Sequence, residues 1–231
     1  MWRAEIDGRT LRFHLTGINN QNFLMQDEQT GSWWQQVTGE ALFGPLKGRT
    51  LDLVHHDEIS FGLWKREQPG GRVLRPDDGA PWREFSHDWE AETAKLPVVT
   101  PERPGDPFDP RELVAGIALP GASKAYSVAR LRRESPVLDT LAGVPLLLVV
   151  GEDGRSLRVF DRRIDGRTLD LFARPGGPPL VLLDAETGST WSFAGEALSG
   201  PLAGRRLTRV YVLLDAWFDW RTHHPQTRVW R

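Results

Sequence analysis

The chain of 231 residues contains no cysteine. It can therefore form no disulfide, offer no thiolate nucleophile and hold no thiolate zinc site or iron–sulfur cluster. The chain also has no large excess of charge of either sign, because 29 basic and 31 acidic residues leave a net charge of -2. A nearly neutral chain has no general electrostatic attraction to nucleic acid or to anionic membranes, so we expect no nucleic-acid partner.

Long apolar runs are missing as well. The longest, Val144 to Val150, is far shorter than the roughly 20 residues that a membrane-spanning helix needs. We expect no membrane span. The first residues do not have the pattern of a signal peptide, so the sequence as written points to the cytoplasm, and to export only if a further N-terminal segment exists.

The sequence does contain a repeated pattern. Asp7 to Leu11 returns as Asp165 to Leu169, and the run from 30 to 51 returns from 187 to 207. Self-similarity of this kind indicates that one structural unit was copied. We therefore predict a first, incomplete unit over residues 1–75, a proline-rich linker over 76–110 and a second, complete unit over 111–231.

Alternating apolar and polar residues around Asp-Gly turns favour antiparallel strands in both units. The predicted fold class is mainly β, an α+β protein with few short helices and two related β units. One helix should follow Ser60 as its N-cap, with Phe61 and Trp64 facing the sheet; its counterpart should be capped by Asp215.

The second unit also has an opening half, from about 111 to 158, that nothing in the first unit matches. We expect strands at 113–119 and 144–150 there, and an Asp153-Gly154 hairpin. Either this half serves the sheets of both units, or residues precede Met1.

Ten tryptophans are unusually many for this length. Trp34 and Trp191 occupy equivalent places in the two units, as do Trp64 and Trp220. Packing in a shared core explains this best, because large aromatic side chains dominate core burial. Stacking on sugars or bases is the alternative. Trp82, Phe85 and Trp89 should fix part of the linker to a domain surface.

The run G-S-x-W-x-Q-x-x-G-E-A-x-x-G-P-L-x-G, followed by a tryptophan-bearing helix and His224-Pro225, resembles the bacterial and archaeal family called domain of unknown function 3179 (DUF3179). The resemblance implies that a complete unit carries a histidine, an asparagine–aspartate pair and a Cys-x-x-Cys. Thiolate and imidazole together suit a redox centre or a copper or zinc site.

In the second unit that constellation is degenerate. By the resemblance, the cysteine positions fall on Gly151 and Gly154, the histidine on Glu134 and the asparagine on Leu138, and only Asp139 is kept. The first unit keeps polar residues of the family's other half, at Asn22, Gln36 and Glu40.

Three further patterns have simple structural interpretations. His55 to Glu58 should be a solvated strand end, because adjacent side chains on a strand point to opposite faces. His223 and His224 suit a helix C-terminus. Glu40 and Glu196 occur in both units and could form an acid–base pair of the glycosidase type, although a role in turn structure is favoured. Phosphate-binding loops and nucleophile elbows are absent from the sequence.

We therefore expect a binding or scaffolding module rather than an enzyme, with a degenerate redox or metal site, no bound metal, no cofactor and no catalytic residue. Its partner would be a protein, a small molecule or a glycan. Two alternatives stay open: an exported metal or redox protein whose Cys-x-x-Cys half lies upstream of Met1, and a carbohydrate-binding module. The candidate binding residues are Asn22, Trp34, Gln36, Glu40, Trp191 and Glu196.

Overall fold

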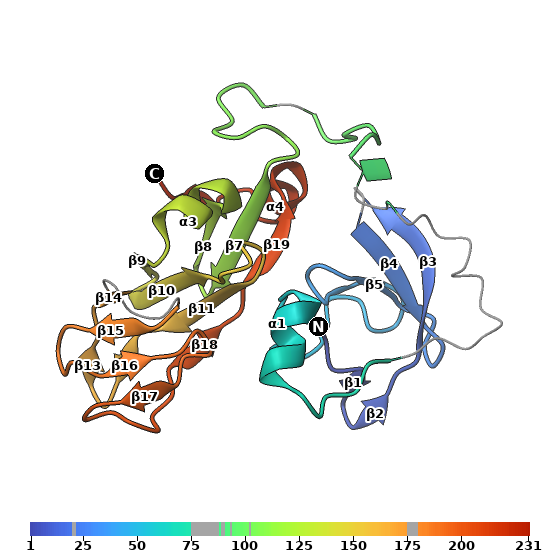
Figure 1. The fold of residues 1–231 in the computed structure, drawn as a ribbon. Coiled ribbons are helices and arrows are strands. Elements are labelled where there is room, and N and C mark those ends of the chain that lie inside the picture. The colour runs from blue at the N-terminus through green and yellow to red at the C-terminus, as the bar shows by residue number, and fades with distance from the viewer. Residues whose placement is uncertain (20–21, 75–87, 89–90, 93, 102, 175–179) are drawn as a thin grey trace.

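A computed structural model describes residues 1–19, 22–74, 88, 91–92, 94–101, 103–174 and 180–231. The predicted linker contacts of Trp82, Phe85 and Trp89 lie outside these residues. The fold is mostly β, as predicted, with antiparallel sheets and short helices. We keep the names first unit (residues 1–75) and second unit (111–231) for the two lobes in Figure 1.

A central four-stranded sheet organises the second unit. Its order is β18-β11-β10-β9, with β9 at Val137–Leu141, β10 at Val144–Val150, β11 at Leu157–Asp161 and β18 at Thr208–Val210. Successive side chains of β10 enter different cores, Leu146 and Leu148 on one side and Leu147 and Val149 on the other. Both faces of this sheet are therefore covered, which explains why the sequence of β10 is continuously apolar.

One face of the central sheet packs against a second sheet, ordered β19-β7-β8-β20, and a helix. These elements are β7 (Leu113–Leu119), β8 (Ala122–Ser127), α3 (Val128–Glu134), β19 (Leu213–Ala216) and β20 (Arg228–Val229). The predicted opening half thus has its expected strands. Helix α4 (Trp217–His223) follows β19 directly and buries Trp217 and Trp220. Asp215 does not cap it as predicted, because Ala216 is the N-cap residue and no side chain caps the helix.

The other face meets a run of short hairpins. It contains β12 (Arg163–Ile164), β13 (Arg167–Thr168), β14 (Leu171–Ala173), β15 (Leu182–Asp184), β16 (Thr190–Trp191) and β17 (Ala197–Ser199). Trp191 is fully buried among Leu147, Phe160 and their neighbours. Its indole Nε1 donates to Asp184 Oδ2 at 2.8 Å, so the buried polar group is satisfied.

The first unit has the same succession of strands. They are β1 (Glu5–Ile6), β2 (Arg9–Thr10), β3 (Phe13–Asn19), β4 (Asn22–Asp27), β5 (Trp33–Gln35) and β6 (Ala41–Phe43). Sheet order β3-β4-β5-β6 corresponds to β14-β15-β16-β17. Trp34 Nε1 donates to Asp27 Oδ2 at 2.9 Å, the counterpart of the Trp191–Asp184 bond. A duplication would produce this agreement, and the duplication itself stays a prediction.

The Asp7-Gly8 and Asp165-Gly166 turns adopt the conformation that their sequence predicts, whereas at the Asp153-Gly154 turn only the glycine has positive φ, 62°. Asp7 and Asp165 have φ 49°, and the glycines that follow them have φ 73° and 77°. Positive φ at both central positions is the requirement of a type I′ turn, which glycine meets without strain.

The units meet through helix α1 (Phe61–Glu67) and the segment before it, not through a shared sheet. Among the described residues, no strand pairing joins the first unit to the second. Instead α1 of the first unit lies against the second unit (Figure 1), and its Leu63 belongs to the core formed by Leu147, Phe160 and Trp191. The idea that the opening half completes both sheets is therefore wrong for the described residues.

Helix α1 begins at the predicted N-cap residue, but the face that it buries is not the predicted one. Ser60 is the N-cap, and its hydroxyl accepts from the Leu63 amide at 3.2 Å. Phe61 is 63% exposed and stacks on Trp64 with ring centroids 5.6 Å apart, so the expectation that these two aromatic residues face the sheet is wrong. The buried residue is Leu63, 8% exposed.

The end of the predicted linker packs against α4. Phe108 meets the Trp217 ring edge to face at 5.3 Å, and Arg221 donates to the Pro101 carbonyl at 2.7 Å. Among the described residues no helix is long and apolar enough to cross a membrane.

We predict that Leu63→Ala lowers the free energy of unfolding by about 2–4 kcal/mol, because it leaves a cavity in the core of the second unit. Phe61→Ala, on the exposed side of the same helix, should cost about 1 kcal/mol or less, the scale of one aromatic pair. Urea titration followed by tryptophan fluorescence measures both variants. Equal losses would show that α1 is not seated as described.

Candidate functional site

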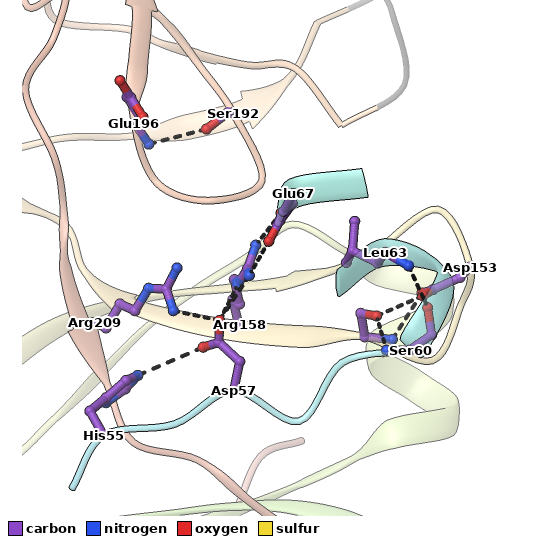
Figure 2. Close-up of polar contacts among 11 residues, drawn as sticks. His55, Asp57, Ser60, Leu63, Glu67, Asp153, Arg158, Ser192, Glu196 and Arg209 are labelled. Atoms are coloured by element: carbon purple, nitrogen blue, oxygen red, sulfur yellow. Dashed lines mark hydrogen bonds and ion pairs between the residues drawn. The ribbon is translucent and has the colours of Figure 1, made fainter. Parts of the chain in front are cut away.

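A buried arginine joins the two units (Figure 2). Arg158 on β11 has a side chain 2% exposed, and its guanidinium donates to Asp57 Oδ2 at 2.8 Å and to Glu67 Oε2 at 2.6 Å. Both carboxylates come from the first unit. Arg209 on β18 also pairs with Asp57, and the Arg158 guanidinium lies 4.7 Å from the Phe193 ring centroid. We call Arg158, Asp57, Glu67 and Arg209 the ionic joint.

The ionic joint corrects the expectation for His55 to Glu58. These residues are not in a strand, and the Asp57 side chain is only 16% exposed. Burial alone would raise the pKa of Asp57, but the hydrogen bonds and charges of Arg158 and Arg209 outweigh it and hold the pKa below its ordinary value. The segment is therefore an inter-unit contact rather than a solvated strand end.

A second contact lies at the turn between Gly151 and Gly154. Asp153 on this turn accepts hydrogen bonds from the hydroxyls of Ser60 and Ser156, at 2.5 and 2.6 Å. Together with the amides of Arg155 and Ser156, these bonds outweigh the effect of burial and lower the pKa of Asp153. The turn thus anchors the N-terminus of α1.

Beside the ionic joint is a cleft of about 460 Å³ between the units, within the range typical of small-molecule sites. We call it the inter-unit cleft. Its apolar wall comes from the core of the first unit, and its opposite wall from the segment around β19. The lining residues are Met1, Trp2, Ala4, Phe13, Asn22, Met25, Trp34, Gln35, Gln36, Val37, Gly39, Leu51, His56, Glu58, Tyr211, Leu213, Leu214 and Asp215.

Several buried polar atoms at the inter-unit cleft have no hydrogen-bond partner. Gln35 is 2% exposed; its Oε1 accepts from Asn19 at 3.1 Å, while its Nε2 is unpartnered. Asp215 Oδ2, and Asp219 Oδ1 close to it, also lack hydrogen-bond partners, although His223 Nε2 lies 3.4 Å from Asp219 Oδ1. Buried polar groups without partners cost free energy, so each of these atoms calls for an explanation.

Asp215 and Asp219 form a coupled pair at the end of β19 and the start of α4. Asp219 is 4% exposed and accepts a hydrogen bond from Asn22 of the first unit. Burial, together with the negative charge of Asp219, raises the pKa of Asp215 to about 8. Burial also raises the pKa of Glu58 on the facing wall, against the opposing effects of His56 and the Met1 amino group.

The family comparison agrees with the motifs. The family described as "Protein of unknown function (DUF3179)" matches residues 1–227. The chain belongs to the DUF3179 family. No curated protein and no solved structure matches it significantly.

Three of the candidate residues of this DUF3179 protein line the inter-unit cleft. Asn22 lies at the start of β4 and reaches Asp219, and Gln36 is exposed at the cleft wall, where its backbone carbonyl accepts from Trp2 Nε1 at 2.6 Å. Trp34 also borders the cleft but is 2% exposed, held in the core by Asp27. Their roles in binding stay predictions.

The other three candidates lie elsewhere. Trp191 is fully buried in the second unit. Each of the two glutamates forms an isolated β-bridge outside the named strands, Glu40 with Thr50 in the first unit and Glu196 with Arg206 in the second. The Glu196 carboxylate pairs with Arg206 at 2.9 Å, and Ser192 Oγ accepts a bond from the Glu196 amide (Figure 2). No interaction between described residues joins the two glutamates into an acid–base pair.

The residues at which the sequence resemblance predicts a degenerate metal or redox site have structural contacts here. Glu134 pairs with Arg130 at 2.7 Å, and Asp139 accepts from Lys124 and from the Tyr126 hydroxyl. Among the described residues, no group of three or more histidine, aspartate or glutamate side chains could hold a metal ion.

Comparison of the units could have revealed the acidic pair that sequence reasoning missed. Helix α4 aligns with α1, so that Asp215 takes the place of Ile59 and Asp219 takes the place of Leu63. Two carboxylates therefore stand where the first unit has apolar residues. Gln35 gave no such signal, because its burial depends on how the units pack.

We predict that Asp215→Asn raises the melting temperature relative to the wild type, and that the gain grows from pH 5 to pH 8. A raised pKa means that the folded state holds a proton that the unfolded state releases above about pH 4. Wild-type stability is therefore lost as pH rises toward the folded pKa of about 8. Asparagine does not titrate, so the difference should reach at least about 3 °C by pH 8.

Differential scanning calorimetry at each pH measures this difference. Asp170→Asn is the control, because Asp170 is 61% exposed and paired with Arg162 outside the inter-unit cleft. If the difference in melting temperature between the wild type and Asp215→Asn does not change with pH, Asp215 does not hold a proton in the folded state.

Proposed function

We propose that this DUF3179 protein is a non-catalytic binding protein whose ligand occupies the inter-unit cleft. The observation that carries the proposal is the combination of a cavity of about 460 Å³ with buried, unpartnered polar atoms at Gln35 and Asp215. A ligand that supplies the missing hydrogen bonds would remove the cost of leaving these atoms unpaired.

The position of the cleft also supports a binding role. Its walls come from both units, and the ionic joint and the Ser60–Asp153 contact hold these walls together. Sites between structural units are common places for small-molecule binding. A pre-formed cleft lowers the entropy cost of binding, because few groups must be ordered when the ligand enters.

The carbohydrate alternative gains less support. Trp34 and Trp191 are 2% and 0% exposed, so neither ring offers a free face on which a sugar could stack. The exported redox alternative requires cysteines that this chain does not contain, and it stays a prediction about a longer protein.

The test is a small-molecule fragment library screened by ligand-observed NMR with the full chain. We expect saturable binders whose affinity falls at least tenfold in Gln36→Trp, because the indole would fill space at the exposed cleft wall. Arg9→Trp, an equally bulky change on exposed strand β2 outside the cleft, should leave binding unchanged. If no fragment binds, or if binders are indifferent to Gln36→Trp, the cleft is not a ligand site.

A further inference from the structure

We propose that the ligand of the inter-unit cleft is a small organic cation, an ammonium or guanidinium group on an apolar body, with its charged head at Asp215 and Asp219. This inference rests on the proposed function and adds the chemical class of the ligand. Three independent features of the described residues lead to it: the charges of the cleft, the unpartnered oxygens of the acidic pair and the apolar opposite wall.

The cleft is acidic. Its lining contributes the carboxyl groups of Glu58 and Asp215, and Asp219, which does not line the cleft, interacts with Asp215, whereas none of the described lining residues is lysine or arginine. The basic groups at the wall are the His56 imidazole and the Met1 amino group, whose nitrogens lie 2.9 Å apart, and burial lowers the pKa of that amino group. An anion would therefore meet repulsion, and a cation would meet attraction.

The acidic pair needs hydrogen-bond donors. A carboxylate only accepts hydrogen bonds, and one oxygen of each aspartate is buried without a hydrogen-bond partner, although His223 Nε2 lies 3.4 Å from that of Asp219. The groups that already contact the pair are the Asn22 amide group, which donates to Asp219, the Ala216 backbone amide, which donates to Asp215 at 2.8 Å, and His223, whose Nε2 lies 3.4 Å from Asp219. A ligand ammonium would add donors and a positive charge, and so offset the repulsion between the two carboxyl groups. A neutral hydroxyl group would supply the hydrogen bonds but leave that repulsion in place.

The remainder of the cleft suits an apolar body. Phe13, Met25 and Leu51 on one side, with Leu213 on the other, form part of its lining. The Gln35 Nε2 group on the same wall still lacks an acceptor, which an oxygen of the ligand could provide. A cation with an aromatic or aliphatic body and one oxygen acceptor would thus match each surface that it meets.

Binding of a cation should depend on pH. Asp219 from α4 and Glu58 and Tyr211 from the segments beside the cleft interact electrostatically with Asp215, and His223 from α4 and Asn22 from β4 contact Asp219. The proton on Asp215 and the cation compete for the same negative charge. Affinity should therefore rise by about tenfold or more from pH 6 to pH 8, as Asp215 gives up its proton.

The test uses three probes with the same ring, measured on the full chain by isothermal titration calorimetry at pH 8. They are tyramine, which carries an ammonium group; tyrosol, its neutral alcohol counterpart; and hydroxyphenylacetate, its carboxylate counterpart. We expect one-to-one binding of tyramine alone, at least tenfold weaker in Asp215→Asn and at pH 6. Asp170→Asn, which neutralises an exposed carboxylate outside the cleft, should leave affinity unchanged.

Thermal unfolding confirms that Asp215→Asn is folded; if it is not, Glu58→Gln replaces it and should also weaken tyramine binding. If tyrosol or hydroxyphenylacetate binds as tightly as tyramine, the ligand class is not cationic. If that binding is also lost in Gln36→Trp, the cleft is still the binding site. Failure of tyramine to bind would also overturn the cationic class, and the fragment screen would then decide separately whether the cleft binds ligands at all. Affinity that is equal at pH 6 and pH 8 would overturn the assignment of the head group to Asp215.

Discussion

The buried charge of Arg158 governs how the two units are joined. A guanidinium cannot give up its proton in a protein, so an arginine 2% exposed must find carboxylates. Asp57 and Glu67 are those carboxylates, and both belong to the first unit. Removing one partner of such a buried pair typically costs about 3–5 kcal/mol. The second unit therefore leaves a charge unsatisfied until the first unit is in place, and the inter-unit cleft exists only when the two are joined.

Local sequence signals predicted the strands well, and they failed where two units meet. Asp7-Gly8 and Asp165-Gly166 specify their turns through backbone conformation alone, so neighbouring residues suffice. Ser60 is a cap for the same reason. The face that α1 buries depends instead on what lies opposite, because Leu63 enters the core of the other unit, beside Leu147 and Phe160. Periodicity within the helix cannot supply that information.

In the candidate site, too, sequence patterns identify some residues, and others become evident only from tertiary packing. Asn22 and Gln36 could be selected from the family pattern, and they line the cleft. The sequence predicts a helix-capping role for Asp215, because an aspartate before a helix normally has that role. Its raised pKa arises instead from burial and from the charge of Asp219, which depend on tertiary packing. No sequence pattern marks Gln35 as a candidate binding residue, because the missing hydrogen-bond partner of its Nε2 is a property of the folded structure.

The seating of α1 has a consequence for the integrity of the chain. Leu63, Arg158 and Ser60 tie the first unit to the second by noncovalent contacts alone. A backbone break between α1 and β7 would leave every one of these contacts in place. The two pieces would then remain associated as a nicked complex, and they would come apart only when the core that holds Leu63 itself melts.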